Sequence, residues 1–68
     1  MDEQLNRVGR RERQIIDLLL QGCDNSEIAQ DLNIAERTVK AHLGSIYKKL
    51  GVESRAAAVA FAVQRRLV

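Results

Sequence analysis

The sequence predicts an all-α protein, and three features of its 68 residues indicate this class. Apolar residues recur at three- and four-residue intervals, the spacing of one face of a helix. The alternation of apolar and polar residues that marks a half-buried strand is absent. The chain has no proline, and its glycines, apart from Gly44, fall at or near expected helix ends. A chain of this length forms one small domain with a modest core. Such a core is marginal by itself, so close helix packing or self-association must add to the stability of the domain.

The first two helices have clear start and stop signals. The first is expected from about Arg10 to Gln21, and Gly22 ends it because glycine takes the left-handed conformation without penalty. Asp24 and Glu27 are spaced as a capping box for the second helix, which is short and ends near Leu32. Residues 1–7 are polar and poorly patterned, so we expect a flexible lead-in before a domain over residues 8–68.

The other two helices complete an expected four-helix bundle. The third runs from about Glu36 to Leu50 after Ala35, which has no side-chain oxygen to cap it, and Gly51 ends it. Ser54 is the expected N-cap of the fourth helix, from Arg55 to about Arg66.

The second and third helices, with the turn between them, form the most informative segment. Asn33 tolerates the left-handed geometry that this turn needs. Apolar residues lie where two steeply crossing helices would touch, namely Ile28, Ala29 and Leu32 on the first and Val39, Leu43, Ile46 and Leu50 on the second. This pattern is typical of a helix-turn-helix, whose second helix lies in the DNA major groove.

Charge is distributed unevenly along the chain. Residues 1–36 carry four basic and eight acidic side chains, a net charge of −4. Residues 37–68 carry seven basic side chains and one acidic side chain, a net charge of +6. A concentration of positive charge suits a phosphate partner, although a simply solvated basic half would give the same totals.

Several functional classes lack support in the sequence. One cysteine forms neither an internal disulfide nor a metal site. Neither a membrane-spanning run nor a leader sequence is present, so the expected compartment is the cytoplasm. No acid–base pair, nucleophile arrangement or phosphate-binding loop is recognisable, so we expect neither an enzyme nor a cofactor.

The expected third helix has a buried stripe and an opposite stripe suited to DNA. On an ideal helix, the side chains of Leu43, Ile46 and Leu50 point within about forty degrees on either side of the direction of Val39. Candidate DNA-binding residues lie outside this stripe: Arg37, Thr38, Lys40, Ala41, His42, Gly44, Ser45 and Lys48. Lys40 or Arg37 would donate to guanine acceptors and Ala41 would contact a thymine methyl, whereas Thr38, His42, Ser45 and Lys49 would reach phosphates. An ordinary solvated face is the alternative.

Some residues on these helices admit two interpretations. Gly44 either lets the helix backbone approach base edges closely or is a tolerated defect, since a mid-helix glycine costs about 1 kcal/mol relative to alanine. His42 has no ligand or nucleophile partner, so a phosphate contact or a packing role is expected. Cys23 is expected to be a small buried hydrophobe. Glu12, on the apolar side of the first helix, is expected to satisfy free backbone N–H groups or to pair with an arginine.

Five motifs occur along the chain: Arg11-Glu12-Arg13, Asn25-Ser26-Glu27-Ile28-Ala29, Thr38-Val39-Lys40-Ala41-His42-Leu43, Lys49-Leu50-Gly51-Val52 and Ser54-Arg55-Ala56-Ala57-Ala58-Val59. Together they resemble the LuxR-type helix-turn-helix domain, the output domain of quorum-sensing regulators and of many bacterial two-component response regulators. The resemblance covers about residues 8–68. It implies a wingless four-helix domain whose third helix reads the major groove and whose fourth helix pairs with its twin on adjacent half-sites.

Carried onto this chain, the resemblance places Lys40, Ala41 and Gly44 at the main base-facing positions and Thr38 and His42 near phosphates. Three departures from the family pattern are visible. Gly44 stands where response regulators often have a polar or basic side chain, Ala35 replaces the usual serine cap, and Val8-Gly9-Arg10 replaces the usual Leu-Thr-Pro opening.

The fourth helix is apolar on more than one side, which favours more than one packing partner. Ala58, Val59 and Ala62 form one stripe, and Ala56, Ala60, Val63 and Leu67 form another. The expected dimer residues are Ala56, Ala57, Ala60, Phe61, Val63 and Gln64. The alternative is that alanine is simply a good helix former at exposed sites.

The leading function is therefore sequence-specific binding of double-stranded DNA by a homodimer, as the output of a bacterial transcriptional regulator. A module that docks onto RNA polymerase is a second possibility, because the promoter-recognition domain of sigma factors has similar helices. A purely structural helical dimer is a third.

Overall fold

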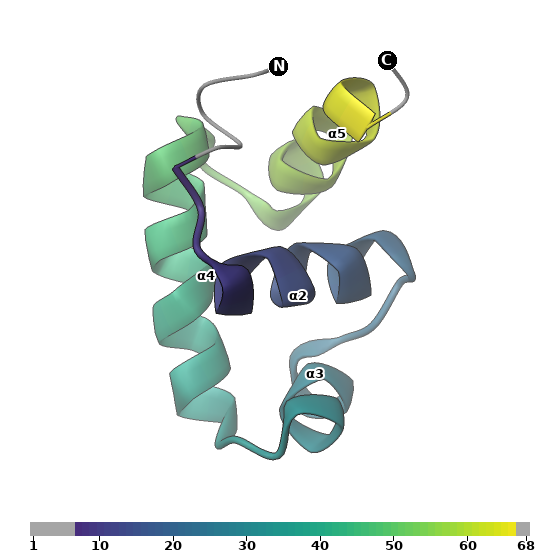
Figure 1. The fold of residues 1–68 in the computed structure, drawn as a ribbon, viewed down its shortest axis with the longest axis vertical. Helices are drawn as coiled ribbons and strands as arrows, with labels where there is room; N and C mark the ends of the chain where they lie inside the picture. Colours follow the sequence, from purple (N-terminus) through teal and green to yellow (C-terminus); the bar gives the residue numbers. More distant parts are fainter. Residues whose placement is uncertain (1–6, 67–68) are drawn as a thin grey trace.

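Four α-helices cross one another in the computed structural model, which describes residues 7–66. They are α2 (Arg10–Leu20), α3 (Asn25–Leu32), α4 (Glu36–Leu50) and α5 (Arg55–Arg66). Figure 1 shows α4 along one side of the molecule, with α3 near its start, α2 across its middle and α5 near its end. No strand occurs in this range, so the prediction of an all-α, four-helix protein is confirmed.

The helix ends follow the local signals in the sequence. Gly22, Asn33 and Gly51 adopt positive φ angles of 87°, 57° and 72°, which end α2, α3 and α4 in left-handed turns. The first helix ends at Leu20, one residue earlier than predicted, and Gln21 is its C-cap. Of the expected lead-in, only Arg7 lies within the described residues, where it is exposed in a turn.

The helix starts also agree with the predictions. The capping box at α3 has both of its bonds, because the Glu27 N–H donates to Asp24 and the Asp24 N–H donates to Glu27, each at 2.8 Å. Ser54 Oγ accepts from the Ala57 N–H at 3.1 Å and caps α5. Ala35 makes no side-chain cap at the start of α4, because a methyl group cannot accept a hydrogen bond.

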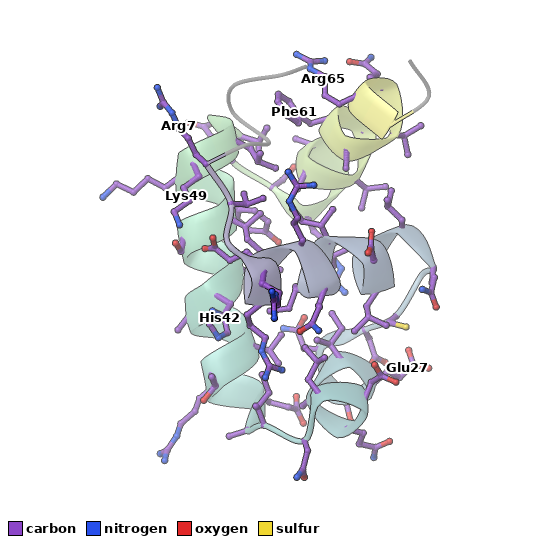
Figure 2. All side chains as sticks on the ribbon, in the orientation of Figure 1. Arg7, Glu27, His42, Lys49, Phe61 and Arg65 are labelled. Atoms are coloured by element: carbon purple, nitrogen blue, oxygen red, sulfur yellow. The ribbon has the colours of Figure 1, made fainter. Side chains whose placement is uncertain are left out.

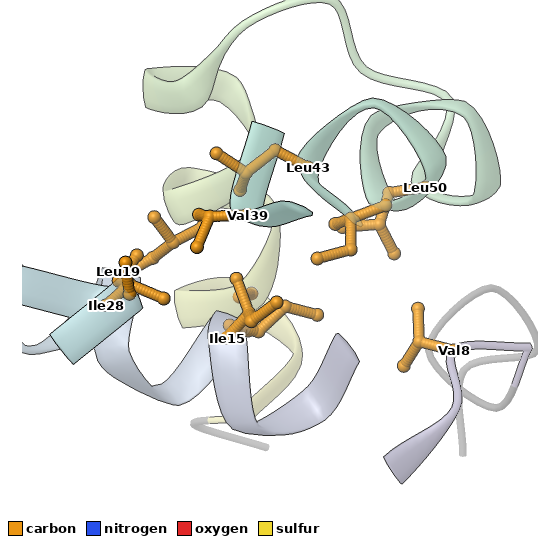
Figure 3. Packing of buried hydrophobic residues seen from close by; sticks show 11 residues of the cluster. Val8, Ile15, Leu19, Ile28, Val39, Leu43 and Leu50 are labelled. Carbon is orange, nitrogen blue, oxygen red and sulfur yellow. The ribbon is translucent and has the colours of Figure 1, made fainter. Parts of the chain in front are cut away.

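One core lies where the helices meet, and α4 contributes its whole apolar stripe to it. The stripe consists of Val39, Leu43, Ile46 and Leu50, each at most 5 % exposed. Ile15 of α2 and Ile28 of α3 pack against it with no exposed area (Figure 3). Val8, which precedes α2, is also buried in this cluster. Ala58 and Ala62 of α5 are buried as well. Cys23, which was expected to be buried, is only half-buried at the edge of the core.

Arg55, the first residue of α5, ties this helix to the start of α3. Its guanidinium donates to Asn25 Oδ1 at 2.7 Å and to the backbone carbonyl of Cys23. The bond to Asn25 joins residues 30 positions apart, so it fixes the start of α5 against the helix-turn-helix. The sequence pattern predicts no role for Arg55 beyond its place in the motif over residues 54–59.

Glu12, the buried acidic residue of α2, is satisfied by two donors. Its Oε1 accepts from the Gly9 N–H at 2.9 Å and from Lys49 Nζ of α4 at 2.8 Å. The predicted backbone contact is therefore confirmed, but the charged partner is a lysine and not an arginine. Lys49, which we expected to reach phosphates, instead makes an ion pair inside the domain. The reason is position, because α2 crosses the middle of α4 and brings Glu12 within reach of Ser45 and Lys49.

The same contacts decide the protonation of Glu12. Burial alone would raise its pKa, but hydrogen bonds from Lys49, from the Gly9 N–H and from Ser45 outweigh burial, so the pKa is lowered. A lowered folded-state pKa means that the ion pair stabilises the domain above the pKa of an unfolded glutamate, about 4.3. This contribution is lost as the pH falls through the lower pKa of the folded state.

We predict that Glu12→Gln destabilises the domain by about 1 kcal/mol at pH 7, at the low end for charged hydrogen bonds because the Lys49 side chain is 39 % exposed and screened by water. The difference in unfolding free energy between the two proteins should shrink as the pH falls below about 4. Urea unfolding followed by circular dichroism at several pH values measures it.

Asp31→Asn is the matched control, because it removes an exposed carboxylate from α3. It should change the unfolding free energy at pH 7 by less than about 0.5 kcal/mol. A Glu12→Gln protein as stable as the wild type at pH 7 would contradict the role assigned to this ion pair.

Candidate nucleic-acid interface

The side of α4 that faces away from the core is exposed and basic. Its exposed residues are Arg37, Lys40, Ala41, Gly44 and Lys48. They lie opposite the buried stripe because both sets follow the helical period of 3.6 residues. Within the described part of the chain, no carboxylate pairs with Arg37, Lys40 or Lys48, so these cations face solvent. This surface has the charge that binding to phosphates requires.

A second strip of α4 borders this surface and is only half-exposed. It contains Thr38, His42, Ser45 and Lys49, which recur at intervals of three or four residues. Figure 2 shows His42 on α4 next to the start of α2. Ser45 and Lys49 both hydrogen-bond to Glu12, so the structure brings this part of the strip into contact with α2. Thr38 and His42 remain beside the exposed face.

Gly44 lies in the middle of α4 on the exposed face. A Cβ atom placed there would meet no atom within 4 Å, so packing inside the domain does not require glycine. Its φ angle is also not positive, unlike those of Gly22 and Gly51. The local structure therefore gives no reason for the stability lost by a glycine in a helix interior.

The predicted dimer residues of α5 divide into two groups. Ala56, Ala60, Val63 and Gln64 are exposed, and Val63 is the exposed large hydrophobic residue of the described part of the chain, at 39 %. Ala57 and Phe61 are half-buried, and Phe61 packs against the domain's own core. The Arg65 guanidinium lies 4.2 Å from the centre of the Phe61 ring, a cation–π contact. Leu67, part of the predicted apolar stripe, lies outside the described residues.

No group of His, Cys, Asp and Glu side chains among the described residues is placed to hold a metal ion. No described helix has the length and apolar character needed to cross a membrane.

Sequence reasoning missed the link between Glu12 and the strip of α4. A signal for it exists, since a glutamate on the apolar side of a helix needs a cation, and the half-exposed strip of α4 holds one in Lys49. The sequence does not show that this strip and the first turn of α2 meet, because that depends on how the helices cross.

Comparison with known proteins places this geometry in a family. Residues 8–62 match the family described as bacterial regulatory proteins, luxR family. The chain is 41 % identical over 70 residues to the transcriptional regulatory protein YdfI of Bacillus subtilis, covering 100 % of this chain and 33 % of that protein. It is 45 % identical over 56 residues to the nitrate/nitrite response regulator protein NarP of Escherichia coli, covering 82 % of this chain and 26 % of NarP.

The chain is also similar in fold and sequence to a response regulator of known structure. The response regulator ChrA of a heme-sensing two-component system superposes with a TM-score of 0.81 and 48 % sequence identity, over 88 % of this chain and 30 % of ChrA. The chain thus spans about a third or less of the proteins that it matches.

The resemblance stated from the motifs is confirmed, and with it the class of function. This is a LuxR-type DNA-binding output domain of transcriptional regulators, and the family is one of regulatory DNA-binding domains, not a class of enzymes. The chain belongs to the luxR family of bacterial regulatory proteins.

Proposed function

We propose that this domain, over residues 8–68, binds double-stranded DNA sequence-specifically with α4 in the major groove. The observation that carries the proposal is the division of α4 into a buried apolar stripe and an exposed basic face. An α-helix fits the major groove, where each base pair presents a distinct set of donors and acceptors. Because bacterial DNA lies in the cytoplasm, we propose that compartment as the site of action.

The proposed contacts follow the exposure of each side chain on α4. Lys40 and Arg37 donate to guanine acceptors, and Ala41 packs against a thymine methyl. Lys48 faces solvent and contacts a phosphate. Thr38 and His42, on the bordering strip, lie near phosphates as well, and the Ser45 hydroxyl divides its hydrogen bonds between Glu12 and the DNA.

We also propose that two domains bind adjacent half-sites through α5. The exposed residues Ala56, Ala60 and Val63 support this, because small side chains allow two helices to approach closely. Phe61 packs against the domain's own core and Ala57 is half-buried, so both take a smaller part in the contact. Docking onto RNA polymerase is the alternative, and the selection of duplexes described next separates it from sequence-specific DNA binding.

A random-sequence pool of short duplexes tests the proposal. The domain is titrated with the pool at two salt concentrations, and the bound duplexes are sequenced. An enriched pair of half-sites about one helical turn apart is the expected result for a dimer of this kind. Weak and unselective binding that modest salt abolishes would contradict sequence-specific recognition and favour docking onto a protein.

We predict that Lys40→Ala weakens binding to the selected duplex by about 1–3 kcal/mol, because a good base contact is worth that much in discrimination. Its effect on a shuffled duplex of the same composition should be smaller, since a base contact is lost only where the base is present. Fluorescence anisotropy with both duplexes measures the two affinities. Equal losses on both duplexes would reassign Lys40 to a phosphate.

We predict that Gly44→Ala stabilises the free domain by about 1 kcal/mol, because the added methyl group meets open space and alanine is the better helix former. The same substitution should weaken binding to the selected duplex, since the α4 backbone approaches base edges most closely at Gly44. Thermal unfolding and anisotropy give the two values. A stabilised variant with unchanged affinity would show that Gly44 makes no close approach.

We predict that Ala60→Glu lowers affinity for a duplex with two half-sites and leaves affinity for a single half-site nearly unchanged, because it places a charge where two α5 helices meet. Gln21→Glu, at the exposed end of α2, is the control with the same change in charge. Loss of affinity on both duplexes would contradict an α5 dimer contact.

A further inference from the structure

The start of α2 carries arginines that the proposed α4 contacts do not use. Arg7, Arg10 and Arg11 are all exposed. Among residues 7–65 no carboxylate forms an ion pair with any of the three. The net charge of residues 1–36 is negative, so this local concentration of positive charge does not show in a count over that half of the chain.

The stability of α2 does not account for these residues. Arg10 and Arg11 are the first two residues of the helix, where the positive end of the macrodipole disfavours cations. Their neighbour Glu12 does not offset them, because its Oε1 already accepts from Gly9 and Lys49. Adjacent like charges also repel one another. The arrangement opposes local helix stability, so the stability of α2 does not explain why these arginines are there.

The packing of α2 places these arginines at the edge of the α4 surface. The Glu12–Lys49 bond of 2.8 Å and the bond from Ser45 hold the first turn of α2 beside the half-exposed strip of α4. Val8 is buried in the core near Leu50, so the chain enters α2 along the C-terminal half of α4 (Figure 3). Figure 2 shows Arg7 and Lys49 on the same side of the molecule.

A helix in the major groove has a phosphate backbone on each flank. The half-exposed strip of α4 separates its exposed basic face from the start of α2. The start of α2 therefore lies on the side of α4 where one of these two phosphate backbones would pass, beside Ser45 and Lys49. Arginine suits this position, because its planar guanidinium donates two parallel hydrogen bonds to a phosphate and keeps its charge at every accessible pH.

We propose that Arg7, Arg10 and Arg11 form a second phosphate-binding surface, which contacts the DNA backbone beside the C-terminal half of α4. This inference rests on the proposed function, since it takes α4 to be in the major groove. The contacts carry no sequence information. They set the depth and angle at which α4 enters the groove, and they make up for the ion pair that withholds Lys49 from the DNA.

Arg10→Gln and Arg11→Gln, made separately, test the proposal with the whole 68-residue domain. Binding is measured by anisotropy across a salt series, with the selected duplex and with its shuffled counterpart. Each variant should lower the slope of log affinity against log salt by about 0.9, the value for one lost phosphate contact. The affinity should fall by a similar factor on both duplexes, unlike the sequence-dependent loss expected for Lys40→Ala.

Three further proteins separate the proposal from simpler explanations. Gln21→Glu changes the net charge by the same amount at the far end of α2 and should keep the wild-type slope. Arg11→Lys keeps the charge and should keep the slope as well. Arg7→Gln should lower the slope as the other two glutamine variants do.

Thermal unfolding shows whether a loss of binding reflects a loss of fold. Because a cation is removed from the start of a helix, Arg10→Gln and Arg11→Gln should unfold at the wild-type temperature or above it. Folded variants with the wild-type slope would overturn the proposal while leaving the α4 interface intact, and an equal loss of slope in Gln21→Glu would overturn it too. A wild-type domain without salt-dependent DNA binding would instead overturn the proposed function itself.

Discussion

Three other helices bury one side of α4, and this constraint determines the rest of the molecule. Val39 and Ile46 have no exposed area, so α4 cannot rotate about its axis without losing apolar contacts to α2 and α3. Burying such side chains is worth about 1.5–3 kcal/mol each, which is large for a domain with a single small core. The opposite side, with Lys40 and Gly44, is therefore held toward solvent. The proposed DNA-binding surface is therefore oriented by the packing on the opposite side of α4.

A polar contact adds to the apolar contacts that hold α2 against α4. Glu12 connects the first turn of α2 to Lys49 of α4, and it also holds Ser45. Its lowered pKa shows that these donors outweigh the penalty of burial. The ion pair engages Lys49 within the domain, and it holds the start of α2, with its arginines, beside the proposed DNA-binding surface of α4. The Glu12–Lys49 ion pair, which stabilises the domain, thus also influences which cations stay exposed on the proposed DNA-binding surface.

Much of this was predictable from the sequence, for identifiable reasons. Helix ends were readable because Asn33 and Gly51 occupy left-handed positions and Asp24 forms a local cap. The buried and exposed faces of α4 followed from the three- and four-residue spacing of its apolar side chains. The partner of Glu12 was not predictable, because it lies 37 residues away and depends on how two helices cross. For the same reason the two groups of residues on α5, and the position of the α2 arginines beside α4, became visible only in three dimensions.

Methylation protection shows whether α4 occupies the major groove. Dimethyl sulfate modifies guanine N7 in the major groove and adenine N3 in the minor groove. With the domain bound to its selected duplex, α4 in the major groove should protect guanine N7 within each half-site and leave adenine N3 there unprotected. Protection of adenine N3 alone, or full reactivity of every guanine at saturating protein, would contradict this position of α4.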